Sequence, residues 1–129
     1  MTFNKVVVIG GGVLEAQIAL MSAYTGHDTT LWLRSEGSIG RTQPKIERYS
    51  SLMIEDLEKA KALLGNPMGV FLYPRGLIKS WAQATAEEID GLIAQAKDRF
   101  ASLIHLELDM AKAVTGANVV MQRDRKSVV

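Results

Sequence analysis

The residues best suited to chemistry lie near the start of the chain, where a glycine-rich turn follows an apolar run. Residues 4–27 read NKVVVIGGGVLEAQIALMSAYTGH, with Gly10 and Gly12 directly after the run. In such a turn the first glycine permits a tight bend and the second lets a pyrophosphate approach the backbone. The N–H groups that begin the following helix, at Val13 and Leu14, would face the anion. This pattern predicts a cofactor-binding turn for a dinucleotide.

The third position of the pattern, three residues after Gly12, departs from it. A third glycine normally lets the helix pack closely on the strand, and this sequence has Glu15 instead. A glutamate in the first helical turn complements the helix dipole, but beside a pyrophosphate it would be repulsive. Two interpretations stay open: a nucleotide site with weakened binding, or a tight strand-to-helix turn that binds nothing.

A second test of the site lies about twenty residues beyond the glycines, where NAD-binding proteins place an Asp or Glu on the ribose 2′-hydroxyl. Here Leu33 holds that place, followed by Arg34 and Ser35, with Arg41 close in sequence. A guanidinium and a hydroxyl there could hold a 2′-phosphate and favour NADP. The alternative is a solvated arginine in a surface loop, so the cofactor is predicted as NAD or NADP.

Other residues indicate less chemistry. We expect His27 to lie at a surface turn and His105 to be a partly buried structural histidine within a strand. Trp32 and Trp81 are interpreted as packing residues, and the basic RDRK segment at 123–126 is too short to argue for nucleic acid. No Ser/His/Asp set or metal-ligand spacing stands out, so we expect no catalytic residue and no metal site in this chain.

The elements that must position these residues follow from the spacing of apolar side chains. Strands are predicted at 5–10, 29–33, 102–108 and 117–122. Helices are predicted over 13–25, from Pro44 to about residue 64, from a Thr85 cap to Phe100, and over 109–114. Residues 35–45 are expected to form a turn-rich loop, and 67–84, where proline and glycine interrupt short apolar runs, a loop or short helix.

Alternating strands and helices predict an α/β fold, a Rossmann-like doubly wound parallel sheet with strand order 3-2-1-4. A large helical crossover would join strands two and three. The 129 residues suffice for a single partial dinucleotide-binding domain, with a poorly matched tail over 122–129.

Composition excludes several classes of partner. The net charge of +1 gives no electrostatic case for nucleic acid or an anionic membrane. The chain has no cysteine and no run long enough for a signal peptide or membrane span. These features predict a cytoplasmic protein.

Three segments together resemble a known family. Residues 5–33 (KVVVIGGGVLEAQIALMSAYTGHDTTLWL), the helix after Pro44 and residues 106–120 (LELDMAKAVTGANVV) are similar to the N-terminal NAD-binding domain of the 3-hydroxyacyl-CoA dehydrogenases. The resemblance covers about residues 4–121. It implies an oxidoreductase of fatty acid metabolism that passes a hydride between 3-hydroxyacyl-CoA and a nicotinamide.

The resemblance also implies what this sequence does not contain. The family's catalytic His–Glu pair, its substrate-orienting Ser and Asn and its helical C-terminal domain would lie beyond residue 129. Glu15, Leu33 and Gln122 depart from the family pattern, Gln122 standing where a strand-four Glu is expected. We therefore expect a truncated domain that is inactive alone. The alternative is a non-catalytic dinucleotide-binding or oligomerising module with a degenerate site.

Assembly is a separate expectation. The apolar strand over 118–122 would be left as a sheet edge with unpaired backbone groups, an arrangement that invites pairing with another chain. We expect a homodimer, or a higher even oligomer, with this strand at or near the interface. It would form either by edge pairing of this strand or by exchange of the helical crossover between subunits.

Overall fold

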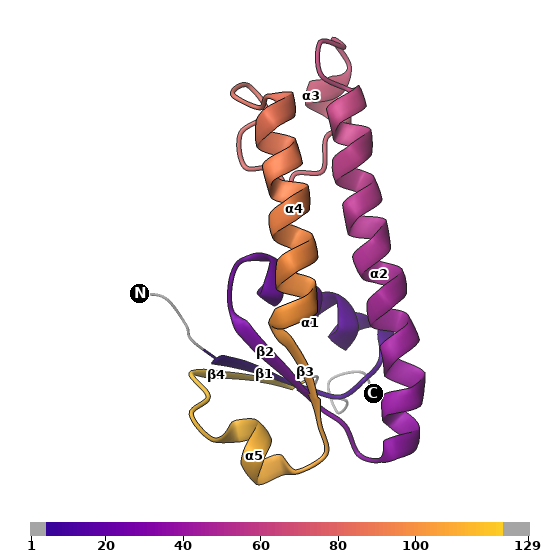
Figure 1. The fold of residues 1–129 in the computed structure, drawn as a ribbon, viewed down its shortest axis with the longest axis vertical. Helices are drawn as coiled ribbons and strands as arrows, with labels where there is room; N and C mark the ends of the chain where they lie inside the picture. The colour runs from indigo at the N-terminus through magenta and orange to yellow at the C-terminus, as the bar shows by residue number, and fades with distance from the viewer. Residues whose placement is uncertain (1–4, 123–129) are drawn as a thin grey trace, which may run out of the picture.

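The computed structural model describes residues 5–122 as a parallel sheet that carries a long helical hairpin (Figure 1). The strands are β1 (Lys5–Ile9), β2 (Asp28–Trp32), β3 (Ile104–Glu107) and β4 (Val119–Gln122). They are ordered β3-β2-β1-β4, and every neighbouring pair is parallel. The predicted fold class and strand order are confirmed. The tail over 123–129, with its RDRK segment, lies outside the described residues.

The centre of the sheet is β1, whose β-branched run is buried because neighbouring elements cover both of its faces. Helix α1 (Val13–Tyr24) packs on the sheet through its small residues, with Ala16, Ala19 and Ala23 fully buried. Gly26 ends this segment with φ +99°, a backbone conformation that side chains rarely adopt. The predicted strand-helix-strand unit therefore forms as expected.

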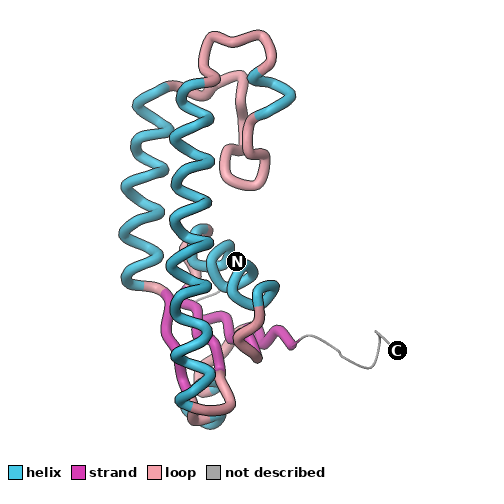
Figure 2. The backbone as a smooth tube through the Cα atoms, turned by 90° about the vertical axis from the view of Figure 1, so that its right-hand side faces the viewer, coloured by secondary structure: helices cyan, strands magenta, loops and turns pink. Residues whose placement is uncertain are grey.

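The large crossover between β2 and β3 is a helical hairpin that projects away from the sheet, as Figure 2 shows. Its arms are α2 (Glu36–Ala62) and α4 (Ala86–Ser102), and the short α3 (Gly69–Leu72) lies near its tip. The arms enclose a core of their own, made of Leu57, Ala60, Leu77, Ile78, Ile89, Ile93 and Ala96. The hydroxyl of Thr85 caps α4 by accepting the Glu88 N–H at 3.1 Å, as the sequence predicted.

The expectation of a loop over residues 35–45 is wrong, because α2 already begins at Glu36. Ser35 caps this helix by accepting the Ser38 N–H, and Glu36 complements the dipole in the first turn. Pro44 lies inside the helix, where it removes one N–H and crowds the carbonyl four residues earlier. The helix continues through it because the buried Thr42 packs against the glycine-rich turn.

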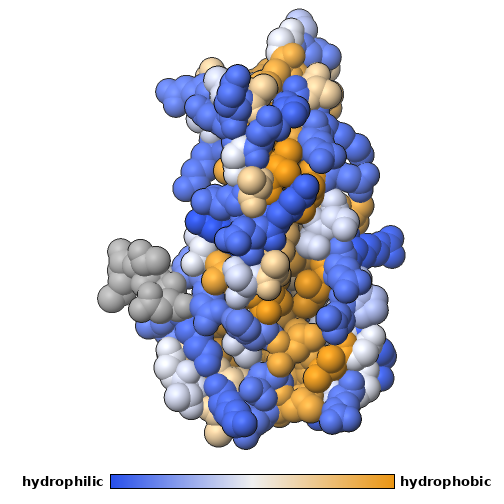
Figure 3. Space-filling model, viewed as in Figure 1, coloured by the Kyte–Doolittle hydropathy of each residue, from blue (hydrophilic) through white to orange (hydrophobic). Residues whose placement is uncertain are grey.

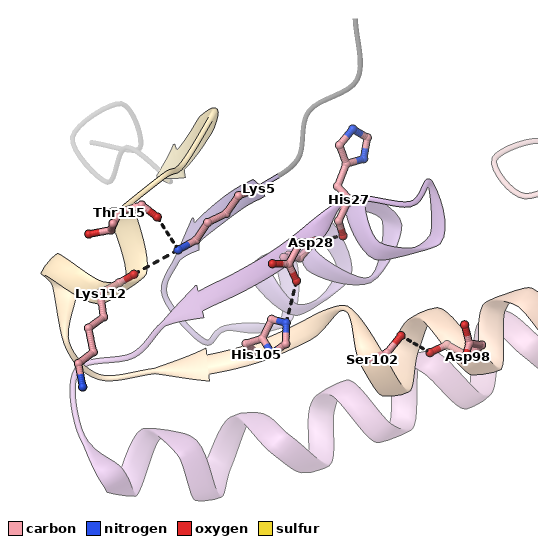
Figure 4. A network of polar contacts seen from close by, with 9 residues as sticks. Lys5, His27, Asp28, Asp98, Ser102, His105, Lys112 and Thr115 are labelled. Atoms are coloured by element: carbon pink, nitrogen blue, oxygen red, sulfur yellow. Dashed lines mark hydrogen bonds and ion pairs between the residues drawn. The ribbon is translucent and has the colours of Figure 1, made fainter.

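Helix α5 (Met110–Val114) lies on the other side of the sheet from α1 and α4 (Figure 1). Asp109 caps it as predicted, accepting the N–H groups of Ala111 and Lys112. The ammonium of Lys5 donates to the carbonyls of Lys112 and Thr115 at the helix end, as Figure 4 shows. A cation there complements the negative end of the helix dipole, so β1 and α5 are held together.

The surface is mixed in character. On the face in Figure 3, apolar side chains gather where the hairpin meets the sheet, and hydrophilic ones cover much of the hairpin. Helix α3 exposes Val70, Phe71 and Leu72, with Phe71 67% accessible. Over residues 5–122, no helix combines the length and the apolar character needed to cross a membrane.

Candidate functional site

A cleft of about 940 Å³ opens at the carboxyl ends of β1, β2 and β4. Its lining comprises Ile9, Gly10, Gly11, Gly12, Glu15, Trp32, Leu33, Arg34, Ser35, Ser38, Arg41, Thr42, Lys45 and Gln122. Four of the predicted site residues, Gly10, Gly12, Arg34 and Ser35, are therefore brought together. The other two, Val13 and Leu14, begin α1 with side chains exposed to solvent, so only their backbone N–H groups are suited to an anion.

The glycine-rich turn is tight, as the pattern predicts. Gly10 has φ +115° and donates its N–H to the Trp32 carbonyl at 2.9 Å, and Gly12 is the N-cap of α1. The backbone of Gly12 is extended, so the helix begins directly after it. As at any helix start, the first N–H groups of α1 have no intrahelical partners. The turn thus has the backbone geometry of a phosphate-binding loop.

The middle glycine has a role that the sequence did not indicate. A Cβ on Gly11 would lie 2.7 Å from Leu33 Cδ2 and would collide with the Thr42 hydroxyl. The Gly11 carbonyl accepts from Lys45 Nζ at 3.1 Å and from Thr42 Oγ1 at 3.3 Å. Gly11 is therefore required by the packing of α2. The sequence did not indicate Thr42 and Lys45 as cleft residues, because no motif includes them and residues 35–45 were expected to form a loop.

Glu15 folds back over the turn. A Cβ on Gly10 would lie 3.2 Å from Glu15 Oε1, and a Cβ on Gly12 would lie 3.1 Å from Glu15 Oε2. The carboxylate therefore fills the space above both glycines, where the pattern places a pyrophosphate. Within residues 5–122, Glu15 Oε2 is buried without a hydrogen-bond partner. The proximity of the α1 N-terminus compensates this charge in part.

At the end of β2 the cleft is bordered by donors. Leu33 is 1% exposed and belongs to the core. After it, the hydroxyls of Ser35 and Ser38 lie 3.2 Å apart, and Arg41 Nη2 donates to Ser38 Oγ at 3.1 Å. Arg34, which precedes Ser35, is exposed and is also among the lining residues. The sequence did not indicate Ser38 as a cleft residue, because the helical turn that holds it was expected to be a loop.

Trp32 and Gln122 complete the walls of the cleft. The Trp32 indole donates to the Leu108 carbonyl at 2.8 Å, which fixes its ring against the β3–α5 connection. Gln122 pairs in register with Ile9, at the carboxyl end of β4. An amide there can donate or accept but cannot act as a general base.

Neither histidine lies in the cleft. His105 is exposed rather than partly buried, and it lies on β3, an edge strand of the described sheet. Its Nε2 lies 2.7 Å from Asp28 Oδ1 (Figure 4). His27 lies in the α1–β2 turn with Nδ1 2.9 Å from Thr25 Oγ1. Across the described part of the chain, no three His, Asp or Glu side chains are grouped to hold a metal ion.

Comparison with known proteins gives matches in structure only. No protein-family model matches the sequence, and no curated protein matches it. A diketoreductase structure superposes with a TM-score of 0.59 at 19% identity, over 99% of this chain and 34% of that one. FadB2 of M. tuberculosis gives 0.53 at 18% identity, over 96% and 32%. The (S)-3-hydroxybutyryl-CoA dehydrogenase PaaH1 of Ralstonia eutropha gives 0.55 at 14%, over 97% and 32%.

The chain spans about a third of the length of each of these structures. At these identities the likeness concerns the fold, and it extends over nearly the whole of this chain. The parallel sheet and the long helical crossover are therefore features that this chain has in common with part of solved 3-hydroxyacyl-CoA dehydrogenase structures.

Proposed function

We propose that this chain is the dinucleotide-binding part of an oxidoreductase of the 3-hydroxyacyl-CoA dehydrogenase type. The observation that carries the proposal is the position of the cleft. It lies at the carboxyl ends of β1 and β4, on either side of the point where the strand order reverses. Parallel α/β sheets bind ligands at this switch point. The tight turn at Gly10 and Gly12 and the start of α1 face the same space.

The residues present fit a dinucleotide in part. The backbone of Gly10, Gly12, Val13 and Leu14 would hold the pyrophosphate, and Arg34 and Ser35 the ribose end. The nicotinamide supplies the hydride acceptor when it is bound. Glu15 opposes this fit, since its carboxylate must leave the turn before an anion can enter. The proposal therefore includes weak binding.

Calorimetric titration with NAD, NADH, NADP and NADPH tests this function. We expect weak binding to the natural chain and tighter binding to the Glu15→Gly variant. Glu87→Gly is a matched control, because Glu87 is also a first-turn carboxylate but lies on α4 and does not line the cleft. Absence of binding to both the natural chain and Glu15→Gly would contradict a dinucleotide site.

A second function, a non-catalytic module with a degenerate site, is favoured by the buried Glu15 oxygen. In that case the carboxylate is a permanent internal substitute for the phosphate and stabilises the α1 N-terminus. A Glu15→Gly chain with a lower free energy of unfolding that still binds none of the four nucleotides would favour this function over the first.

For assembly we propose a cytoplasmic homodimer that pairs through β4. Within the described chain β4 pairs with β1 alone, and Val120 and Met121 are 51% and 39% exposed. An apolar groove of about 550 Å³ runs beside it, with Val6 and Ile18 among its walls. Unpaired strand edges and contiguous apolar surface both favour association. Light scattering at micromolar concentration and amide exchange over 118–122 test this; a monomer with rapid exchange there would contradict it.

A further inference from the structure

The start of α2 brings the Arg41 guanidinium and the hydroxyls of Ser35 and Ser38 together at the cleft, and the exposed Arg34 directly precedes them in sequence. Arg41 Nη2 donates to Ser38 Oγ at 3.1 Å, and a Cβ on Gly37 would lie 3.3 Å from Arg41 Nη1. Gly37 therefore gives the Arg41 guanidinium room beside the helix. Ser35 Oγ lies 3.2 Å from Ser38 Oγ, and Arg34, the residue before Ser35, is also among the lining residues. The neighbouring acid Glu36 is exposed and is not among the lining residues.

The glycine turn of the cleft carries a carboxylate as well as a cation. Glu15 is the one carboxylate among the lining residues described, and it lies above Gly10 and Gly12. The Lys45 ammonium of α2 donates to the Gly11 carbonyl at 3.1 Å. Glu15 therefore opposes an anion directly above Gly10 and Gly12, whereas no carboxylate among the described lining residues opposes one at the start of α2.

A ribose without a 2′-phosphate has a poor partner at this end. The position where a carboxylate would accept its 2′-hydroxyl is Leu33, whose side chain is buried in the core. A phosphomonoester is suited to the same place, because it carries close to two negative charges and matches the planar fork of a guanidinium. The two serine hydroxyls offer further donors.

We propose that a phosphomonoester bound by Arg34, Ser35, Ser38 and Arg41 anchors the ligand, so that the cleft selects the 2′-phosphate of NADP over NAD. The inference rests on the proposed dinucleotide function and assigns the larger part of the affinity to the 2′-phosphate end. The pyrophosphate contributes little while Glu15 covers the turn.

The experiment compares four ligands on the full 129-residue chain at one ionic strength. Adenosine 2′-monophosphate carries the phosphomonoester alone, ADP the pyrophosphate alone, NADP both and NAD the pyrophosphate. We expect adenosine 2′-monophosphate and NADP to bind about tenfold more tightly than ADP and NAD, the size of one charge-assisted contact. Equal affinities, or tighter ADP and NAD, would overturn the inference and leave the proposed function standing.

Two variants separate the ends of the cleft. Arg41→Ala should weaken the binding of adenosine 2′-monophosphate and NADP about tenfold and leave the affinities for ADP and NAD unchanged. Arg48→Ala is the control, an exposed arginine of the same helix that does not line the cleft. Glu15→Gln should tighten the binding of ADP, NAD and NADP but leave the affinity for adenosine 2′-monophosphate unchanged. An Arg41→Ala chain that is folded by circular dichroism and keeps its NADP affinity would overturn the inference.

The remaining outcomes distinguish the two proposals. Binding of adenosine 2′-monophosphate without NADP, even in Glu15→Gly, would support the phosphomonoester site and contradict the dinucleotide function. No binding of any of the four ligands to the natural chain and to Glu15→Gly would overturn both.

Discussion

Glu15 Oε2 lies 3.1 Å from the point that a Cβ on Gly12 would occupy. The side chain of Glu15, at the third position of the glycine pattern, thus folds back over Gly12, at the second position. The glutamate therefore covers the turn that would bind a phosphate. The relationship decides what the cleft can accept, because the carboxylate and a ligand phosphate compete for one space next to the α1 N-terminus.

Replacing Glu15 by glycine should tighten binding of NAD and NADP. The change removes a like charge and a bulky group from the turn, which is expected to gain about 1–3 kcal/mol of binding free energy. Calorimetry gives the affinities, and Glu15→Gln separates charge from size. A glycine in the first helical turn lowers the free energy of unfolding by up to about 1 kcal/mol, so unfolding curves accompany the titrations. Unchanged affinity in both variants would show that the carboxylate does not obstruct the ligand.

Gly11→Ala should destabilise the fold without touching the glycines predicted to bind a ligand. The added methyl group would meet Thr42 and Leu33, both about 1% exposed. Overpacking at a closely packed contact costs about 1–3 kcal/mol. Urea unfolding measures the loss.

Gly91→Ala on α4 is the control for that variant, since nothing lies within 4 Å of its added Cβ. It should raise the free energy of unfolding by about 0.5–1 kcal/mol through the helix propensity of alanine. If the two variants changed the free energy of unfolding equally, the close approach of α2 to the turn would not explain why residue 11 is a glycine.

Tyr24 should make stability depend on pH in the alkaline range. Burial raises the pKa of the Tyr24 hydroxyl above its ordinary value of 10.0, and the nearby Arg99 lowers it by a smaller amount. The hydroxyl donates to the Leu77 carbonyl at 2.7 Å, linking α1 to the hairpin. Because the pKa is higher in the folded chain, this stabilisation is complete below pH 10.0 and is lost as the pH rises through the folded-state value.

Tyr24→Phe checks this dependence. The variant should lose about 0.5–1.5 kcal/mol at neutral pH with the hydrogen bond, and less as the pH rises above the tyrosine pKa. Tyr49→Phe on α2 serves as control, and unfolding curves across alkaline pH give the difference. A Tyr24→Phe chain whose deficit is constant with pH would contradict the assignment.

The 129-residue chain by itself should not reduce acetoacetyl-CoA with NADH or NADPH. Among the described residues that line the cleft there is no histidine, and Glu15 is committed to the glycine turn. A hydride transfer of this type needs an acid–base group within hydrogen-bond reach of the reacting oxygen. A spectrophotometric assay of the purified chain measures the rate, and turnover lost on heat unfolding would refute the prediction.

The sequence by itself determined the order and type of most elements, because their signals are local. The apolar β-branched run of β1, the Thr85 and Asp109 caps and the stop at Gly26 each act within a few residues. The position of the cleft also followed from sequence, since carboxyl ends of parallel strands meet at one edge. The sequence could therefore place Gly10, Gly12, Arg34 and Ser35 at this edge of the sheet, where they line one cleft.

Tertiary structure decided what lies inside that site. Proline and two glycines in residues 35–45 predict a loop, yet the segment is helical: Ser35 caps it, and Thr42 packs on Gly11, 31 residues away along the chain. The same contact brings Ser38 and Arg41 to the cleft. Whether Glu15 points to solvent or back over Gly10 and Gly12 depends on the space left between α1 and the turn. Such contacts are long-range and carry no local pattern, so only the folded chain establishes them.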